Sequence, residues 1–275
     1  MRFGFSAATP VIFACLVSGA AQSEIVLSDE ELAWRANNPA VTIAVDNDFA
    51  PINFIEDGRP VGIAVDLLEL IEKRSGLDID LTVDRWSVLI DLALQHRVDG
   101  IINADMTAER QERLLYTRPY YRVPQALVVR NDAPPITTPD DLVDQRVAVL
   151  EGTSRVGYLR RHHPGVTIVE AATILDLFGL LIAGEADVLL SALPVTHHAM
   201  TLNLVTGLRV SGVFQTDEID SLHIAVRNDM PRLQAILDKA IADISREERL
   251  DILAKWLPQA LLQPQRNGAG VALSD

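Results

Sequence analysis

Two kinds of hydrophobic pattern alternate along most of this chain. Short continuous apolar runs such as Val41–Val45 are typical of strands that are buried on both faces of a sheet. Longer stretches with apolar residues three and four positions apart, such as Ile63–Arg74, predict amphipathic helices. The alternation of strand and helix predicts α/β lobes with mostly parallel sheets that are flanked by helices.

The alternation comes in two series, which predicts two lobes. The predicted strands of both series lie at 41–45, 79–83, 98–102, 146–150, 166–169, 187–190 and 208–213. The predicted helices between them lie at 63–74, 87–96, 154–161, 174–183 and 195–203. Two extended stretches, near 119–130 and 219–227, are expected to carry the chain across to the second lobe and back.

These crossings set the expected boundaries. Lobe 1 comprises 41–130 together with 219–258, and lobe 2 comprises 131–218. A helical extension at 24–40 comes first, because Ser28-Asp29-Glu30-Glu31 matches a capping box. The last segment, 259–275, contains Gly, Gln, Asn and Pro with little periodicity, and we expect it to be a flexible tail.

The first 23 residues predict a cleaved signal peptide. Arg2 precedes the apolar stretch Phe3–Val17, and small residues follow up to Ser23. Export would place the mature chain in the periplasm. The single cysteine, Cys15, lies inside this segment, so the mature chain would have neither a disulfide nor a Cys-based zinc site.

Composition and charge exclude several classes of function. The chain has 24 Lys and Arg against 38 Asp and Glu, a net charge of −14, which argues against nucleic acid as a partner. Its six histidines lack the i, i+4 spacing of zinc helices, and no phosphate loop, nucleophile elbow or dinucleotide fingerprint is present. We therefore expect no metal, no cofactor and no enzyme. After residue 23 no segment approaches twenty apolar residues, so we expect a soluble mature protein.

A series of short motifs, in this order and spacing, resembles the periplasmic amino-acid-binding proteins of solute-binding family 3. The motifs are Asp46–Phe54, Gly62–Leu67, Val98–Gly100, Thr107–Arg110, Tyr116–Tyr120, Gly152–Ser154 and Gly184–Asp187. The resemblance spans about residues 28 to 257. It implies a two-lobed periplasmic-binding-protein fold (type II), a Venus flytrap with a two-strand hinge. The opening at Leu27–Pro39 most resembles the flytrap sensor modules of bacterial hybrid histidine kinases.

The resemblance also implies a site for a ligand carboxylate. Arg110 matches the family arginine that pairs with this carboxylate, and Thr153 and Ser154 match the turn that holds it from the second lobe. Arg155 follows at a position that can also reach the cleft. The simpler interpretations are a surface arginine on a charged helix, and a Ser or Thr that only caps a helix.

Three further positions match the part of the family site that surrounds the rest of the ligand. Phe49 and Trp86 match its aromatic or apolar walls, although a single aromatic residue is more often part of a core. Asp46 matches an aspartate that reads the ligand's distal group. An equally good interpretation makes Asp46 a turn former in the sequence Asp46-Asn47-Asp48.

Two departures from the family pattern concern the ligand itself. Ala192 stands where amino-acid binders have an aspartate for the ligand ammonium. Asn103 and Asp105 stand where relatives usually have small hydroxyl residues. A carboxylate at Asp105 would repel a ligand carboxylate, neutralise Arg110 or attract an amine. We therefore expect a ligand that is not a standard α-amino acid, or one that binds in a changed orientation.

Three functions are compatible with these observations. We favour a monomeric periplasmic solute-binding protein that closes over a small polar ligand, bearing a carboxylate or an amine, and delivers it to the membrane subunits of an ABC importer. The alternative is an extracytoplasmic sensor that signals through a membrane partner. A third interpretation is an enzyme similar to cyclohexadienyl dehydratases, with Asp105 as general acid, but no independent acid–base pair is present.

Overall fold

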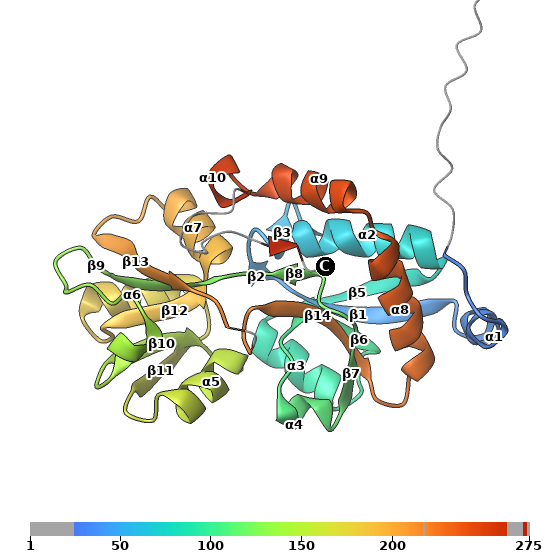
Figure 1. Ribbon diagram of the computed structural model, residues 1–275, viewed down its shortest axis with the longest axis horizontal. Helices are drawn as coiled ribbons and strands as arrows, with labels where there is room; N and C mark the ends of the chain where they lie inside the picture. Colours follow the sequence, from blue (N-terminus) through green and yellow to red (C-terminus); the bar gives the residue numbers. More distant parts are fainter. Residues whose placement is uncertain (1–24, 217, 263–271, 274–275) are drawn as a thin grey trace, which may run out of the picture.

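The computed structural model describes residues 25–216, 218–262 and 272–273, so the predicted signal peptide at 1–23 lies outside the described residues (Figure 1). The described helices are α1 (Asp29–Asn37), α2 (Ile63–Ser75), α3 (Trp86–Leu94), α4 (Ala108–Gln111), α5 (Ser154–His162), α6 (Ile174–Ala183), α7 (Leu193–Leu202), α8 (Pro231–Asp243), α9 (Arg246–Trp256) and α10 (Gln259–Leu262), with one 3-10 turn at Pro139–Leu142. None of these helices is long and apolar enough to cross a membrane.

Three sheets are present among the described residues. The seven-stranded sheet has the order β15-β8-β14-β6-β1-β5, with β7 also paired to β14, and its strands are β1 (Ala40–Asp46), β5 (Asp78–Asp84), β6 (Gly100–Ala104), β7 (Leu114–Tyr116), β8 (Tyr121–Arg122), β14 (Ser221–Arg227) and β15 (Ala272–Leu273). The five-stranded sheet has the order β11-β10-β12-β9-β13, and its strands are β9 (Gln125–Arg130), β10 (Arg146–Leu150), β11 (Thr167–Ala171), β12 (Val188–Ala192) and β13 (Leu208–Phe214). A small antiparallel sheet joins β2 (Asp48–Phe49), β3 (Asn53–Glu56) and β4 (Arg59–Val61).

The first lobe is built on parallel pairing of β1 with β5 and β6. The side chains of β1 from Ile43 to Asp46 are buried, as expected for a strand that is covered on both faces. The helix that follows the small sheet, α2, begins after Gly62, which has φ 123°. A β carbon at Gly62 would lie 2.5 Å from the carbonyl oxygen of Ile52, so only glycine fits where the helix meets the small sheet.

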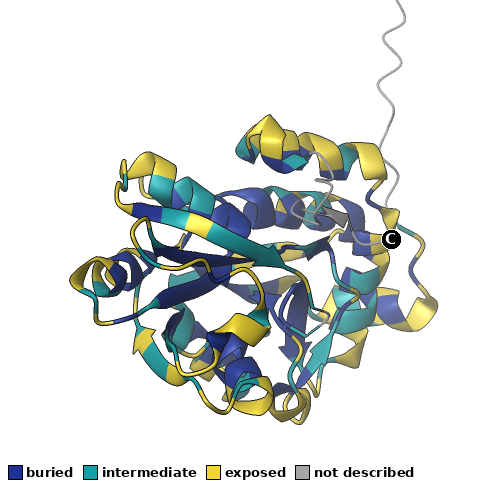
Figure 2. Cartoon of the chain, turned by 60° about the vertical axis from the view of Figure 1, so that its left-hand side comes forward, coloured by how far each residue is buried: buried dark blue, intermediate teal, exposed yellow. Residues whose placement is uncertain are grey.

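The second lobe repeats this architecture around β10, which pairs in parallel with β11 and β12. The strands β9 and β13 extend the sheet in antiparallel pairing. Helices α5 and α6 pack beside the sheet, and its strands β9, β10 and β12 are almost entirely buried (dark blue in Figure 2). Both lobes therefore have mixed sheets, in which three parallel strands form one side of the sheet and antiparallel strands extend it on the other.

The chain crosses from the first lobe to the second between β8 and β9. The predicted boundary at residue 130 put the whole of 119–130 in lobe 1, whereas Gln125–Arg130 forms β9 of the second sheet. Residues 125–129 are all buried because β9 pairs on both sides, with β12 and with β13. The chain returns through the segment between Phe214 and Ser221.

The predicted flexible tail contains regular structure in its described part. Gln259–Leu262 forms α10, and Ala272–Leu273 forms β15, which pairs with Tyr121 and Arg122 of β8. The edge of β8 offers free backbone groups next to the crossing, and a returning segment satisfies them. A tail with little hydrophobic periodicity can still add a strand, because strand pairing uses the backbone.

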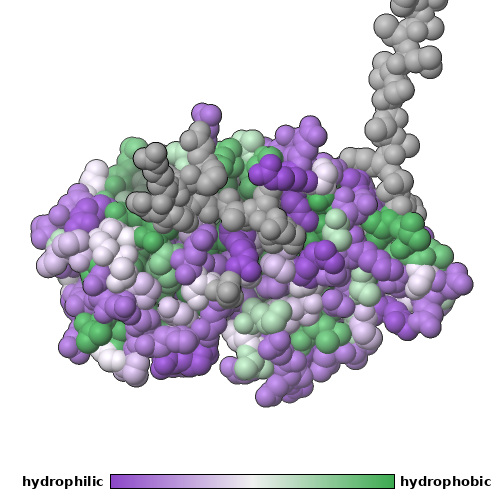
Figure 3. Space-filling model, viewed as in Figure 1, coloured by the Kyte–Doolittle hydropathy of each residue, from purple (hydrophilic) through white to green (hydrophobic). Residues whose placement is uncertain are grey.

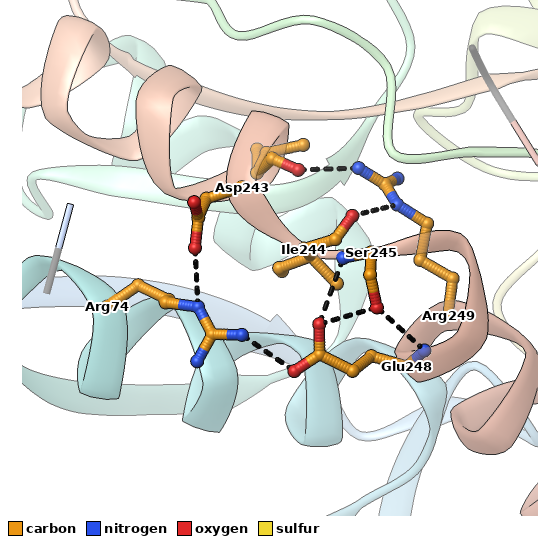
Figure 4. Close-up of polar contacts among 7 residues, drawn as sticks. Arg74, Asp243, Ile244, Ser245, Glu248 and Arg249 are labelled. Atoms are coloured by element: carbon orange, nitrogen blue, oxygen red, sulfur yellow. Dashed lines mark hydrogen bonds and ion pairs between the residues drawn. The ribbon is translucent and has the colours of Figure 1, made fainter. Parts of the chain in front are cut away.

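Two arginines fix the C-terminal helices to the first lobe (Figure 4). Arg74 of α2 donates from Nε to Asp243 at 2.7 Å and from Nη2 to Glu248 at 2.6 Å. Glu248 also closes a capping box with Ser245, which separates α8 from α9. Arg249 donates to the carbonyl oxygens of Ile244 at the end of α8 and of Tyr120 next to the crossing. The helices α8 and α9 are therefore tied both to α2 and to the start of the crossing strand.

Candidate functional site

A cavity lies between the two lobes, at the carboxyl ends of the parallel strands. It encloses about 370 Å³ of empty space, part of it open to solvent. Asp46 ends β1, Asp105 follows β6 and Leu150 ends β10, so the strand ends of both sheets face the same crevice. The lining residues from the two lobes are Asp46, Phe49, Trp86, Asn103, Asp105, Leu150, Thr153, Arg155 and Leu222.

The structure brings the nine predicted site residues together. Seven of them line the cavity, and the other two, Arg110 and Ser154, contact its walls. Arg110 is buried, which excludes the interpretation as a surface arginine. Thr153 is the N-cap residue of α5, and its hydroxyl donates to the carbonyl oxygen of Leu150 at 2.8 Å. The apolar lining residues Leu150 and Leu222 carry no motif that the sequence would reveal.

Asp105 connects the two lobes through its carboxylate. Oδ2 accepts a hydrogen bond of 2.5 Å from the hydroxyl of Ser154, which begins α5 in the second lobe. Oδ1 is buried and has no hydrogen-bond partner among the described residues. Burial raises the pKa of Asp105 above its ordinary range, while the charges of Arg155 and Arg110 and the hydrogen bond from Ser154 oppose this rise.

Arg155 is held by a polar network at the crossings between the lobes. Its Nε donates to Oε1 of Gln125 at 2.8 Å, and Gln125 in turn donates to the carbonyl oxygen of Ile219 at 3.0 Å. Asp220, next to Ile219, accepts from the backbone of Thr216 and is close enough to interact electrostatically with Arg155. Burial raises the pKa of Asp220 to about 7. No local sequence pattern indicates a role for Gln125 or Asp220, because Arg155, with which both interact, is distant along the chain.

Asp46, at the end of β1 in the first lobe, is a buried acid in the wall of the cavity. One of its oxygens accepts from the backbone N–H of Asp48 at 3.1 Å, which is the contact of a turn former. No Lys or Arg pairs with Asp46 among the described residues. Burial raises its pKa to about 6. The side chain therefore serves the turn and also presents an uncompensated acid to the cavity.

The amide of Asn103 is used by the protein rather than presented to a ligand. Its nitrogen donates to Asn53, and its oxygen accepts from the hydroxyl of Tyr120. Asn103 has φ 63°, in the left-handed region that asparagine tolerates better than most residues. The departure from the family pattern at Asn103 is thus a structural one, which fixes the end of β6 behind the cavity.

Polar contacts join the two lobes along the edge of the cavity. The indole nitrogen of Trp86 donates to the carbonyl oxygen of Gly152 at 3.0 Å, and Ser87 donates to Glu151 at 2.9 Å. Arg110 donates to the same oxygen of Gly152 at 2.8 Å and lies over the Trp86 ring, 5.6 Å from its centre. The predicted partner of Arg110 was a ligand carboxylate, whereas here it holds the backbone of the opposite lobe.

The groups at the site are those of a small-molecule pocket. The described residues contain no cluster of three or more His, Cys, Asp or Glu that would hold a metal ion. Apolar walls are combined with a few buried charged groups, which is the usual composition of such a pocket. The face of the molecule seen in Figure 3 is mainly hydrophilic where it is not covered in grey, with smaller hydrophobic patches.

The fold, the position of the cavity and the motifs agree with one protein family. Residues 41–259 match the bacterial extracellular solute-binding proteins, family 3, and the chain belongs to this family. Members of the family are extracellular or periplasmic. The chain has the two-lobed type II periplasmic-binding-protein fold of the solved structures that it resembles.

Its relatives include both sensors and transport proteins. The virulence sensor protein BvgS of Bordetella pertussis is 26% identical over 231 residues, which are 83% of this chain and 19% of BvgS. The crystal structure of the periplasmic VFT2 domain of that protein superposes with a TM-score of 0.75 at 25% identity, covering 85% of this chain and 100% of the domain. The ABC transporter arginine-binding protein 1 of Escherichia coli is 26% identical over 223 residues, 80% of this chain and 91% of that protein.

Proposed function

We propose that this protein binds a small polar ligand, bearing an amine or a carboxylate, between its two lobes and delivers it to an ABC importer. In this proposal, the segment 1–23 is a signal peptide and the mature chain acts in the periplasm as a monomer. The observation that carries the proposal is the cavity at the strand ends, where buried charged groups of both lobes, Asp46, Asp105 and Arg155, face one space.

The proposed mechanism is closure of the lobes around the ligand. A ligand that contacts both lobes stabilises the closed form by its difference in affinity between the closed and open forms. The hydrogen bonds from Trp86 and Arg110 to Gly152 add to the closed form, because they also join the lobes. An importer would then recognise the closed shape.

A thermal-shift screen tests binding. Purified protein lacking residues 1–23 is heated with amino acids, polyamines, small amines and simple carboxylates. A ligand at a thousandfold excess over its dissociation constant stabilises the folded state by about 4 kcal/mol, which is a rise of several degrees in Tm. We expect such a rise with at least one of these compounds.

Two arginines close together in the chain provide the matched comparison. Arg110→Ala removes a buried interlobe donor, and Arg113→Ala removes an exposed side chain three residues further on. We expect Arg110→Ala to lower the affinity for the compound found in the screen by tenfold or more and Arg113→Ala to leave it unchanged. Equal affinity of the two variants, or no thermal shift with any compound, would contradict the proposal.

Sensing is the second candidate function, because the similarity to BvgS extends over 83% of this chain. The opening at Leu27–Pro39, which forms α1 after a Ser28 capping box, also resembles sensor modules. Deletion of the gene in the host bacterium distinguishes the two functions. If the protein is part of an importer, the deletion strain loses uptake of the radiolabelled compound. If the protein is a sensor, the deletion strain keeps this uptake but loses the change in transcription that the compound causes.

A further inference from the structure

We infer that the Asp105 side chain takes the place of a ligand carboxylate, so that the cavity selects small organic amines that have no carboxylate next to the amine. The inference rests on the proposed function and narrows its ligand class. It follows from which hydrogen-bond donors and acceptors at the cavity already have partners within the protein.

The Ser154 hydroxyl and the Arg110 guanidinium, which would hold an anion, already donate to groups of the protein. The hydroxyl of Ser154 donates to Asp105, and Arg110 donates to the carbonyl oxygens of Gly152 and of Asp105. Arg155 donates from Nε to Gln125 and faces the charges of both Asp105 and Asp220. To accept from the Ser154 hydroxyl, a ligand carboxylate would have to displace the carboxylate of Asp105, which is covalently part of the protein.

Two acids at the cavity, in contrast, have incomplete sets of partners. Oδ1 of Asp105 is buried without a hydrogen bond, and no Lys or Arg of the described residues pairs with Asp46. Three buried carboxyl groups, those of Asp46, Asp105 and Asp220, stand against two guanidinium groups in this part of the described chain, and burial raises the pKa of each of the three acids. His223 also interacts with Asp105, and burial lowers the pKa of His223, which favours its neutral form. An ammonium group would supply the missing donors, and its charge would favour the ionised form of these acids.

The walls of the cavity determine which chemical groups the rest of the amine ligand can have. Phe49, Leu150 and Leu222 are apolar and buried, so they favour an alkyl or heterocyclic body. At the position where amino-acid binders hold the ligand ammonium, Ala192 is fully buried and apolar. The amine is therefore expected at Asp46 or Asp105 rather than beside Ala192.

Matched ligand pairs test the inference. Agmatine and arginine, and cadaverine and lysine, differ only by a carboxylate, and isothermal titration gives the affinity for each. We expect the parent protein to bind the amine of a pair at least tenfold more tightly than the amino acid. Asp105→Ser should reverse this preference by tenfold or more, because it frees Ser154 and Arg155 and restores a small hydroxyl residue.

Asp105→Asn is the second variant, because it keeps the size of the side chain and removes its charge. We expect it to lose affinity for the amine at least tenfold while keeping a cooperative thermal transition. If the parent binds an amino acid more tightly than its amine, or if Asp105→Asn binds the amine as the parent does, the inference is wrong while the ligand-binding function stands. If neither the parent nor a variant binds any of the four compounds, and no compound of the wider thermal-shift screen raises the Tm, the inference and the proposed ligand-binding function are both wrong.

Discussion

At the scale of single residues, the cavity contains acids in positions that disfavour their charge. Asp46 is 8% exposed, and no Lys or Arg in the described part of the chain pairs with it. A buried carboxylate of this kind destabilises the folded state when it is ionised, and a bound cation would remove this penalty. We interpret Asp46 as a residue retained for binding at the expense of stability.

This interpretation predicts a pH dependence. The pKa of Asp46 rises from an ordinary 3.8 to about 6 on folding, so the folded state holds more protons between these values. The contribution of Asp46 to stability is therefore complete below pH 3.8 and is lost as the pH rises through about 6. The full change corresponds to about 3 kcal/mol. Relative to the parent, Asp46→Asn should gain stability between pH 4 and pH 7, by up to this amount.

Urea denaturation at pH 4, 5, 6 and 7 measures the difference in the free energy of unfolding between parent and variant. Asp78→Asn, at the exposed start of β5, is the control and should show no such trend. A constant difference between Asp46→Asn and the parent over this range would show that Asp46 is ionised normally in the folded protein.

The sequence pointed to the site at this scale because its residues lie in short local motifs. Asp46, Trp86 and Thr153 each follow a strand, and the strand ends of parallel sheets converge. The local pattern did not show that Asp105 would bond to Ser154, 49 positions away, or that Gln125 would hold Arg155. Contacts of this kind depend on how the two lobes close, which no local pattern encodes.

At the scale of elements, the ion pairs of Arg74 hold α8 and α9 on α2. The Arg74 side chain is 6% exposed, whereas Arg232 pairs with Glu30 at 48% exposure. Loss of a buried charge leaves its partners without compensation, while exposed pairs contribute little. We expect Arg74→Met to lower the free energy of unfolding by about 1–3 kcal/mol and Arg232→Met to change it by less than about 0.5 kcal/mol.

Chemical denaturation of the two variants measures this contrast. Both substitutions replace one arginine by the same unbranched side chain, so differences in size and helix propensity largely cancel. Equal effects would show that the junction in Figure 4 is held by packing rather than by the arginine.

The elements themselves were predictable wherever the hydrophobic period was clear. The predicted helix at 174–183 and the predicted strand at 146–150 have the bounds that the structure shows. The lobe to which β9 belongs was not predictable, because both lobes offer buried strands and only the long-range pairing with β12 and β13 decides it. The pairing of β15 was missed because a two-residue strand has no period.

At the scale of the whole molecule, the cavity is formed by residues of both lobes. Each lobe contributes one side of every contact at its rim, such as Trp86 with Gly152 and Ser87 with Glu151. The lobes are joined by two crossings, near Pro124 and Asp220, and the polar network of Arg155 reaches both. In the proposed mechanism, occupation of the cavity is thereby coupled to the relative position of the lobes.

The affinity of Asp46→Asn for the amine that the parent protein binds, measured by isothermal titration at pH 7, tests whether the buried acids of the cavity bind the ligand. We expect this variant to be more stable than the parent and yet to bind the amine at least tenfold more weakly. These opposite signs exclude damaged folding as the cause of lost binding. A variant that binds the amine as tightly as the parent does would show that Asp46 does not bind the ammonium group of the ligand.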